Sequence, residues 1–262
     1  MAKNQSKIKL SVIIPVLNEK ENLKILLKIL ESVIDLRHEV LVVHDFKEDN
    51  SIPVVRKMQK NYPNLRLIHN ALGRGVINAV KAGVKASNGE YVLVIAADDI
   101  GSLLAINDMA FLMENGCDLV NGTRYSHGGR HIGGVFISSL LSSTANGLFY
   151  LLSASSLTDP TLGVKMFKKL KFNELNLEAK PIGWAVSFEF AIKAQIAGWE
   201  LGEVPLISLN RLYGKNKSTF KLKWLAEYLR WFLFGMKNLP LYRRKNKIMI
   251  RIPEIMKSSN ES

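Results

Sequence analysis

The chain has 262 residues, of which 47% are hydrophobic and 23% charged, and its formal net charge is +13. This composition excludes disorder over most of the length, and the length allows one or two domains. The single cysteine, Cys117, excludes an intramolecular disulfide framework and a cysteine-based zinc site. Residues 1–10 lack the apolar core of a secretory signal, so we expect a reducing, cytoplasmic setting.

The positive charge is concentrated toward the C-terminus. Residues 211–251 contain 12 Lys and Arg but a single acidic residue, Glu227. Such an excess is typical of proteins that bind nucleic acid, an anionic membrane surface or a phosphorylated substrate. The charge alone does not choose among these three partners.

The N-terminal half alternates between two hydrophobic periods. Short β-branched apolar runs predict buried strands, and apolar residues at helical spacing predict helices. Strands that alternate with helices predict an α/β fold with a mostly parallel central sheet covered by helices on both faces. The expected strands are 9–17, 39–43, 65–69, 91–97 and 118–121, and the expected helices are 20–34, 54–61, 74–86 and 103–113.

The second half is predicted to be mainly helical. Residues 132–156 are apolar but interrupted by polar side chains, so we expect one or two packed or interfacial helices there. Further along, we expect a helix at 188–197, a strand at 200–207 and a longer helix at 221–239. The simplest division is a domain at 1–218 followed by a basic amphipathic extension at 219–262.

The helix at 221–239 carries an apolar stripe that includes Leu225 and Leu229. We place Glu227 and Arg230 on its opposite, polar face. Such a stripe is most often core-facing, but its aromatic content and the basic run 243–245 also fit a helix lying on a membrane surface.

Acidic residues follow three of the expected strands. Asp98 and Asp99 close the fourth strand, where carboxylates commonly hold a divalent ion such as Mg²⁺ or Mn²⁺ against a diphosphate. Adjacent strand residues point to opposite faces, so the two can share an ion only if the chain turns between them. Glu19 and Asp45 follow the first and second strands and can bond a ribose or base. A turn or a helix cap explains Glu19 and Asp45 equally well, and it is the favoured explanation for Asp98 and Asp99 taken alone.

Gly73-Arg74-Gly75 opens the helix at 74–86. Glycines let a backbone approach closely, and a helix N-terminus favours anions. The chain has no G-x-G-x-x-G or P-loop motif, which disfavours a classical dinucleotide or P-loop site.

Taken together, these segments resemble family 2 glycosyltransferases of the GT-A fold, and more narrowly the dolichol- or polyprenyl-phosphate mannose synthases. The resemblance covers about residues 9–240. It is carried, in order, by SVIIPVLNEKENL, VVHDFKEDN, GRGVINAVKAGVKASNGEYVLV, the Asp98 region, NGTRYSHGGRHIGG, TDPTLGVKMFKK, FEFAIKAQIAGWELGEVPL and NRLYGKNKSTFKLKWL.

The resemblance implies a Rossmann-like GT-A domain that binds a nucleoside-diphosphate sugar, with a C-terminal amphipathic helical extension. It assigns Arg211 and Lys217 to the donor diphosphate, Glu189 to the border of the reaction centre, and Arg124 and Arg130 to the acceptor phosphate. It assigns Asp98, with Asp99, to a divalent cation. The implied nucleotide-binding residues are Pro15, Leu17, Asn18, Glu19, Asp45, Arg74, Ala97, Asp98 and Asp99.

The chain departs from the family pattern where a metal would bind. Ala96 replaces the first carboxylate of the family's Asp-Ala-Asp, and Ile100 stands where relatives carry a polar residue. These replacements place metal dependence in doubt. They also leave open a catalytically impaired homologue that binds nucleotide sugars.

The resulting hypothesis is an inverting glycosyltransferase with a polyprenyl-phosphate acceptor. We expect it to bind peripherally to the anionic surface of the membrane's inner face. The alternatives are an enzyme with another envelope glycan or lipid as acceptor, and a non-enzymatic nucleotide-sugar-binding or nucleic-acid-binding protein. Because the basic C-terminal segment coincides with an amphipathic helix, we do not expect a nucleic-acid partner.

Overall fold

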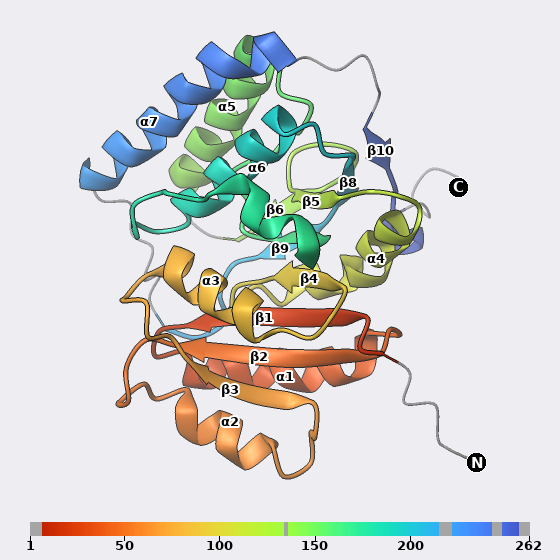
Figure 1. Ribbon diagram of the computed structural model, residues 1–262, viewed down its shortest axis with the longest axis vertical. Coiled ribbons are helices and arrows are strands. Elements are labelled where there is room, and N and C mark those ends of the chain that lie inside the picture. The colour runs from red at the N-terminus through yellow and green to blue at the C-terminus, as the bar shows by residue number, and fades with distance from the viewer. Residues whose placement is uncertain (1–6, 134–135, 215–221, 243–247, 257–262) are drawn as a thin grey trace.

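The computed structural model describes residues 7–133, 136–214, 222–242 and 248–256. An eight-stranded sheet runs through its centre in the order β10-β8-β5-β7-β4-β1-β2-β3, and β6 pairs with β9 in a second sheet (Figure 1). All neighbours in the large sheet are parallel except the two pairs made by β7. The strands are β1 (Leu10–Val16), β2 (His38–His44), β3 (Leu65–His69), β4 (Tyr91–Val94), β5 (Leu119–Thr123), β6 (Arg130–Ile132), β7 (Lys165–Lys168), β8 (Leu201–Pro205), β9 (Ile207–Leu209) and β10 (Met249–Ile250).

Helices cover both faces of the large sheet, and α5 and α7 pack against each other at one end of the molecule (Figure 1). The α-helices are α1 (Lys20–Val33), α2 (Ile52–Met58), α3 (Val76–Ala86), α4 (Ile106–Glu114), α5 (Phe136–Ser153), α6 (Ala185–Ile196) and α7 (Leu222–Asn238). Short 3₁₀ turns form η1 (Gly101–Ala105), η2 (Lys169–Leu175), η3 (Leu239–Tyr242) and η4 (Glu254–Met256).

The alternation of side chains along each central strand creates two cores. In β1, Leu10, Val12 and Ile14 pack on one face with residues of α1, α2 and α4. Ile13 points to the other face, where α3 and α6 cover the sheet. Because strand side chains alternate in direction, a strand buried on both faces must be apolar at nearly every position, as the sequence of β1 is.

The expected α/β fold with a mostly parallel sheet is confirmed. The sequence did not predict β7, whose residues Lys165–Lys168 begin and end with lysine, yet it lies between β4 and β5 and runs antiparallel to both. The strand expected at 200–207 is two strands, because the chain leaves the large sheet at Leu206 and continues as β9 beside β6.

The C-terminal segment packs into the fold. α7 contacts α5 and α6, with Trp231 buried on that side, and β10 pairs with β8 at the edge of the large sheet. The prediction that Glu227 lies on the polar face of this helix is wrong, since the residue is 3% exposed. Its buried carboxylate accepts hydrogen bonds from Trp231 Nε1 (2.9 Å) and the Lys180 N–H (3.0 Å). The boundary expected at 218/219 lies outside the described residues.

The burial of Trp231 makes the cohesion of α7 with the rest of the fold testable. We expect Trp231→Ala to lower the free energy of unfolding by about 3–5 kcal/mol, because it leaves a large cavity between α7 and α6. Leu233→Ala is the matched control: Leu233 lies on the same helix but is 56% exposed, so its loss is expected to stay below about 1 kcal/mol. Urea unfolding measures both, and equal losses would show that α7 is not part of the core.

Candidate active site

The loops that follow β1, β2 and β4 leave the sheet at one edge. β1 pairs in parallel with β2 and β4, so the carboxyl ends of these strands point the same way. In open parallel sheets this edge is where ligands bind. The acidic residues singled out in the sequence therefore come together there.

The first loop is fixed to the second by backbone hydrogen bonds. Asn18 has a left-handed φ of 56°, and its N–H donates to Asp49 Oδ2 at 2.9 Å. The Glu19 N–H donates to Ser51 Oγ, also at 2.9 Å. Pro15 lies within β1 opposite Val43, and Leu17 is 48% exposed beyond the strand end. Among these predicted nucleotide-binding residues, Leu17 and Asn18 lie directly at the edge.

Arg211 links the first and fourth strand ends. Its Nη2 donates to Glu19 Oε2 at 2.5 Å, and its Nη1 lies 3.5 Å from Asp98 Oδ2. The Arg211 side chain is 6% exposed, and that of Asp98 is 31% exposed. Three residues predicted from separate motifs thus form one charged cluster.

Asp45 shapes the turn that opens α3. Its two carboxylate oxygens accept from Asn70 Nδ2 at 2.8 Å and from the Gly75 N–H at 3.0 Å. Gly75 has a φ of 120°, and a Cβ on it would lie 2.4 Å from Pro181 Cβ, so only glycine fits. The exposed Arg74 side chain lies over the ring of Phe46. Asp45 therefore holds the Gly73-Arg74-Gly75 turn in place.

The chain turns between Ala96 and Asp99, whose N–H donates to the Ala96 carbonyl at 3.2 Å. Ala97 belongs to the hydrophobic core. Burial raises the pKa of Asp99 to about 6, and its Oδ1 is buried without a hydrogen-bond partner among the described residues. Asp99 thus points inward while Asp98 points to Arg211.

These residues do not fit a divalent ion. Such an ion takes several oxygen ligands, some of which a bound diphosphate would supply, and the described residues contain no group of three His, Cys, Asp or Glu placed to hold it by themselves. Ala96 brings no ligand atom, and Ile100 packs against the hydrophobic core. On Asp98 an ion would also meet the guanidinium of Arg211.

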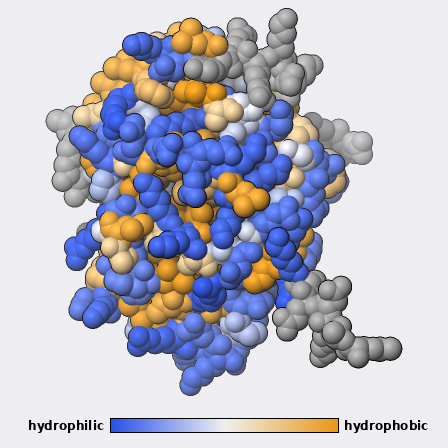
Figure 2. All heavy atoms as spheres, viewed as in Figure 1, coloured by the Kyte–Doolittle hydropathy of each residue, from blue (hydrophilic) through white to orange (hydrophobic). Residues whose placement is uncertain are grey.

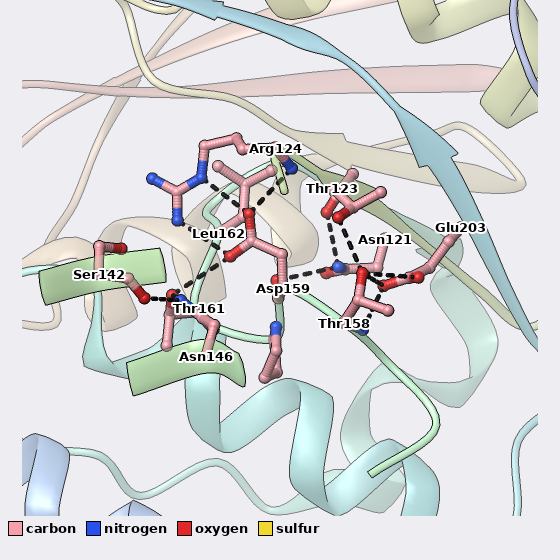
Figure 3. Close-up of polar contacts among 12 residues, drawn as sticks. Asn121, Thr123, Arg124, Ser142, Asn146, Thr158, Asp159, Thr161, Leu162 and Glu203 are labelled. Atoms are coloured by element: carbon pink, nitrogen blue, oxygen red, sulfur yellow. Dashed lines mark hydrogen bonds and ion pairs between the residues drawn. The ribbon is translucent and has the colours of Figure 1, made fainter. Parts of the chain in front are cut away.

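Arg124 is held by a buried aspartate 35 positions along the chain (Figure 3). Its Nε and Nη2 donate to the two oxygens of Asp159 at 2.8 and 2.9 Å, and its backbone N–H donates to Oδ2 at 3.1 Å. Burial opposes the charge on Arg124, but Asp159 outweighs it and raises the pKa of the guanidinium. Arg130, by contrast, has an exposed side chain on β6.

A second set of buried polar groups adjoins this pair (Figure 3). Glu203 is fully buried and accepts from the Thr158 N–H at 2.7 Å, and burial raises its pKa to about 7. Lys165 donates to Asn121 Oδ1 at 2.5 Å and to the Leu162 carbonyl at 2.7 Å, and burial lowers its pKa to about 7. These bonds fix the segment 158–162 against β5 and β8.

Glu189 supports a loop from beneath. It is fully buried, accepts from the N–H groups of Glu178 and Ala179 at 2.7 Å each, and pairs with Lys193. The loop it holds includes Pro181, which contacts Gly75. The structure therefore places Glu189 behind the edge, while Lys217 lies outside the described residues.

The sequence did not single out Asn22, Asp159 or Glu203. Asn22 bonds both Glu19 and the backbone of Tyr213, which joins α1 to the Arg211 loop. One feature of the sequence could have identified Glu203. It is a carboxylate inside the apolar strand β8, and a buried carboxylate must be paired or protonated. The identity of the partners could not be read from the sequence.

Comparison with known proteins shows which proteins the chain is similar to. Residues 11–137 match the family model Glycosyl transferase family 2. The chain is 30% identical over 226 residues to a dolichol-phosphate mannosyltransferase of Pyrococcus furiosus, which covers 85% of this chain and 62% of that protein. It is 24% identical to the dolichol-phosphate mannosyltransferase of Mycosarcoma maydis over 88% of this chain and 81% of that one. The chain thus spans less than two thirds of the Pyrococcus relative.

Among solved structures, glucosyl-3-phosphoglycerate synthase from Mycobacterium tuberculosis, in complex with Mn²⁺, uridine diphosphate and glucosyl-3-phosphoglycerate, is similar with a TM-score of 0.63. The identity is 16%, and the match covers 88% of this chain and 81% of that one. At this identity the similarity concerns the fold, and it agrees with the expected GT-A architecture.

The buried Glu203 predicts a pH-dependent stability. In the folded protein the Glu203 carboxyl keeps its proton up to about pH 7, whereas in the unfolded chain a glutamate loses its proton at about pH 4.3. The protonated Glu203 therefore stabilises the fold at low pH, and this contribution is lost as the pH rises from the lower value to the higher one. We expect Glu203→Gln to reduce the fall in unfolding free energy between about pH 5 and about pH 7 by about 1–3 kcal/mol.

Asp159, His127 and Lys165 also lie near Glu203 and can add to the pH dependence of stability. Each variant is therefore compared with the wild type across the same pH series. Urea unfolding at each pH gives the slope. The exposed Glu114→Gln serves as the control and is expected to keep the wild-type slope. An unchanged slope in Glu203→Gln would contradict the assignment.

Proposed function

The chain carries a glycosyltransferase family 2 domain, and from this premise we propose that it transfers a sugar from a nucleoside-diphosphate sugar to the phosphate of a polyprenyl phosphate. The observation that carries the proposal is the cluster in which Arg211 contacts Glu19 and Asp98 at the carboxyl edge of the sheet. The curated relatives named for dolichol-phosphate mannosyl transfer support the choice of acceptor.

The donor would lie across the ends of β1, β2 and β4. The turn held by Asp45 places Arg74 at the N-terminus of α3, where the helix dipole favours an anion. Asn18 and Glu19 would border the nucleoside on the other side. Arg211 would then face the diphosphate.

The proposed reaction is one direct displacement. An oxygen of the acceptor phosphate bonds to the anomeric carbon, the bond from that carbon to the donor phosphate breaks, and the nucleoside diphosphate leaves with the electron pair. Configuration at the anomeric carbon is inverted because there is one displacement. The acceptor is already an anion, so the site needs to position it and not to remove a proton.

The leaving diphosphate gains negative charge as the bond breaks. A guanidinium fixed before the reaction stabilises that charge without reorganising. Arg211 is fixed in this way by Glu19, Asp98 and the Tyr213 carbonyl. On the acceptor side, Arg130 is exposed, and Arg124 would act from its position on Asp159.

We also propose that the protein docks on an anionic membrane surface, where a polyprenyl phosphate would be presented. Hydrophobic side chains gather at the top of Figure 2, over α5 and α7. Among the described residues, no helix is long and apolar enough to cross a membrane. The positive charge of residues 211–251 complements an anionic leaflet, at about 1 kcal/mol per cation near the surface. The exposed apolar residues are Leu140, Leu141, Leu148, Tyr150, Leu151 and Leu152 of α5 and Leu225, Leu229, Leu233 and Phe234 of α7.

Transfer is tested with radiolabelled GDP and UDP sugars, polyprenyl phosphate and purified protein, followed by lipid extraction, with and without Mg²⁺ or Mn²⁺. We expect labelled lipid from at least one donor and an at least about 100-fold loss of rate in Arg211→Ala, because the leaving charge is then unstabilised. Label that stays in a water-soluble product would indicate another acceptor. No transfer with any donor would reject the proposal.

The acceptor assignment has its own variant. We expect Arg130→Gln to raise the KM for polyprenyl phosphate by about tenfold, because one charge-assisted contact to phosphate is lost. The affinity for the nucleotide, measured by calorimetry, should stay unchanged. A weakened nucleotide affinity with an unchanged acceptor KM would place Arg130 at the donor instead.

Membrane docking is tested by flotation with vesicles that contain anionic lipid. We expect Leu151→Asn with Leu229→Asn to reduce the bound fraction by about tenfold or more, since each leucine loses about 1.5–3 kcal/mol of burial. Leu170→Asn is the matched control, because Leu170 is 91% exposed but lies on η2. Equal effects of both variants would contradict the proposed surface.

A further inference from the structure

Arg211 is bound on three sides at the place where a donor diphosphate would lie. Its Nε donates to the Tyr213 carbonyl at 2.8 Å, its Nη2 donates to Glu19 at 2.5 Å, and its Nη1 lies 3.5 Å from Asp98. With its side chain 6% exposed, the guanidinium is a fixed, nearly desolvated positive charge. A guanidinium carries its positive charge permanently, whereas a metal site becomes positive only after an ion has bound.

The loop that carries Arg211 is itself fixed to α1. The Asn22 side chain donates to the Tyr213 carbonyl at 3.0 Å and accepts from the Tyr213 N–H at 3.1 Å. Asn22 also donates to Glu19 Oε2 at 2.9 Å, the same oxygen that Arg211 contacts. Asn22 is 2% exposed, so these hydrogen bonds are shielded from solvent.

The same place is poorly made for a divalent ion. The carboxylates of Asp98 and Glu19 both lie against the Arg211 guanidinium. Ala96 has no oxygen to offer from its side chain, Ile100 packs into the core, and the Oδ1 of Asp99 is buried. An ion on Asp98 would sit within a few ångströms of the Arg211 guanidinium, where two positive charges repel each other in a partly dry site.

We infer that Arg211 takes the place of a divalent cation in this protein, so that the nucleoside diphosphate is bound without metal. The inference rests on the proposed function, because it concerns the donor diphosphate. Glu19 and Asp98, which would otherwise attract a metal, serve to hold the guanidinium.

The first test measures metal binding without any nucleotide. Mn²⁺ is titrated into the protein and followed by electron paramagnetic resonance, which separates free from bound ion. We expect no saturable site in the wild type at concentrations up to about 1 mM, the weak end of the range for protein cation sites. A saturable Mn²⁺ site in the wild type that binds below about 1 mM and is lost in Asp98→Asn would overturn the inference.

Arg211→Met gives the opposite expectation. Removing the guanidinium takes away the cation that Glu19 and Asp98 both contact, so this variant should gain Mn²⁺ affinity by at least about tenfold. The double variant Arg211→Met with Asp98→Asn is the matched control and should lose the gain. Circular dichroism checks that both are folded, and the wild-type titration decides the matter if they are not.

The second test concerns the nucleotide. Binding of GDP and UDP is measured by calorimetry in EDTA and in excess Mn²⁺, and we expect affinities within about threefold of each other for the nucleotide that binds. An increase of about tenfold or more with Mn²⁺ would overturn the inference. As a positive control, Ala96→Asp restores a carboxylate near Asp98 and should make binding depend on Mn²⁺. If neither nucleotide binds, the proposed function fails, and the Mn²⁺ titration alone still decides whether the protein holds a cation.

Discussion

β1 pairs in parallel with β2 on one side and with β4 on the other, and this pairing determines where the chemistry can lie. Parallel strands end at the same edge, so three loops that are far apart in sequence meet there. Glu19 and Asp98 come from two of these loops, and Arg211 joins them from a segment more than 100 residues later. Without the parallel register, none of the three would have its partner.

The proposed acceptor side depends on polar and charged groups buried inside the protein. Asp159 is fully buried and takes three hydrogen bonds from Arg124, so the guanidinium position is set by the interior and not by solvent. Glu203 and Lys165 hold the neighbouring segment in the same way. A buried charge that loses its partner costs several kcal/mol, which makes such a network rigid once it forms. Rigid placement is what a phosphate-binding residue needs.

The net charge divides into two parts with different surroundings. Arg124 and Arg211 are largely buried and fixed by carboxylates, and they belong to the interior of the site. Arg230 and Lys237 lie on α7, whose Trp231 is buried while Leu225, Leu229 and Leu233 stay exposed. α7 is therefore apolar on two sides, one covered by protein and one facing outward. That second side adjoins α5, and the two helices carry the surface that we propose docks on a membrane.

The amino-acid sequence by itself determined the alternation of strands and helices, the parallel sheet, and the polar residues at the strand ends, because hydrophobic periodicity reports which residues must be buried. It also carried the family resemblance through ordered motifs. It could not determine that Asp45 bonds the Gly75 N–H, that Arg124 pairs with Asp159, or that Glu227 is buried. Those facts depend on partners 4 to 47 positions away, and periodicity describes one segment at a time. The 3.5 Å approach of Asp98 to Arg211 was likewise decided by the tertiary structure, because folding brings together two residues that lie more than 100 positions apart.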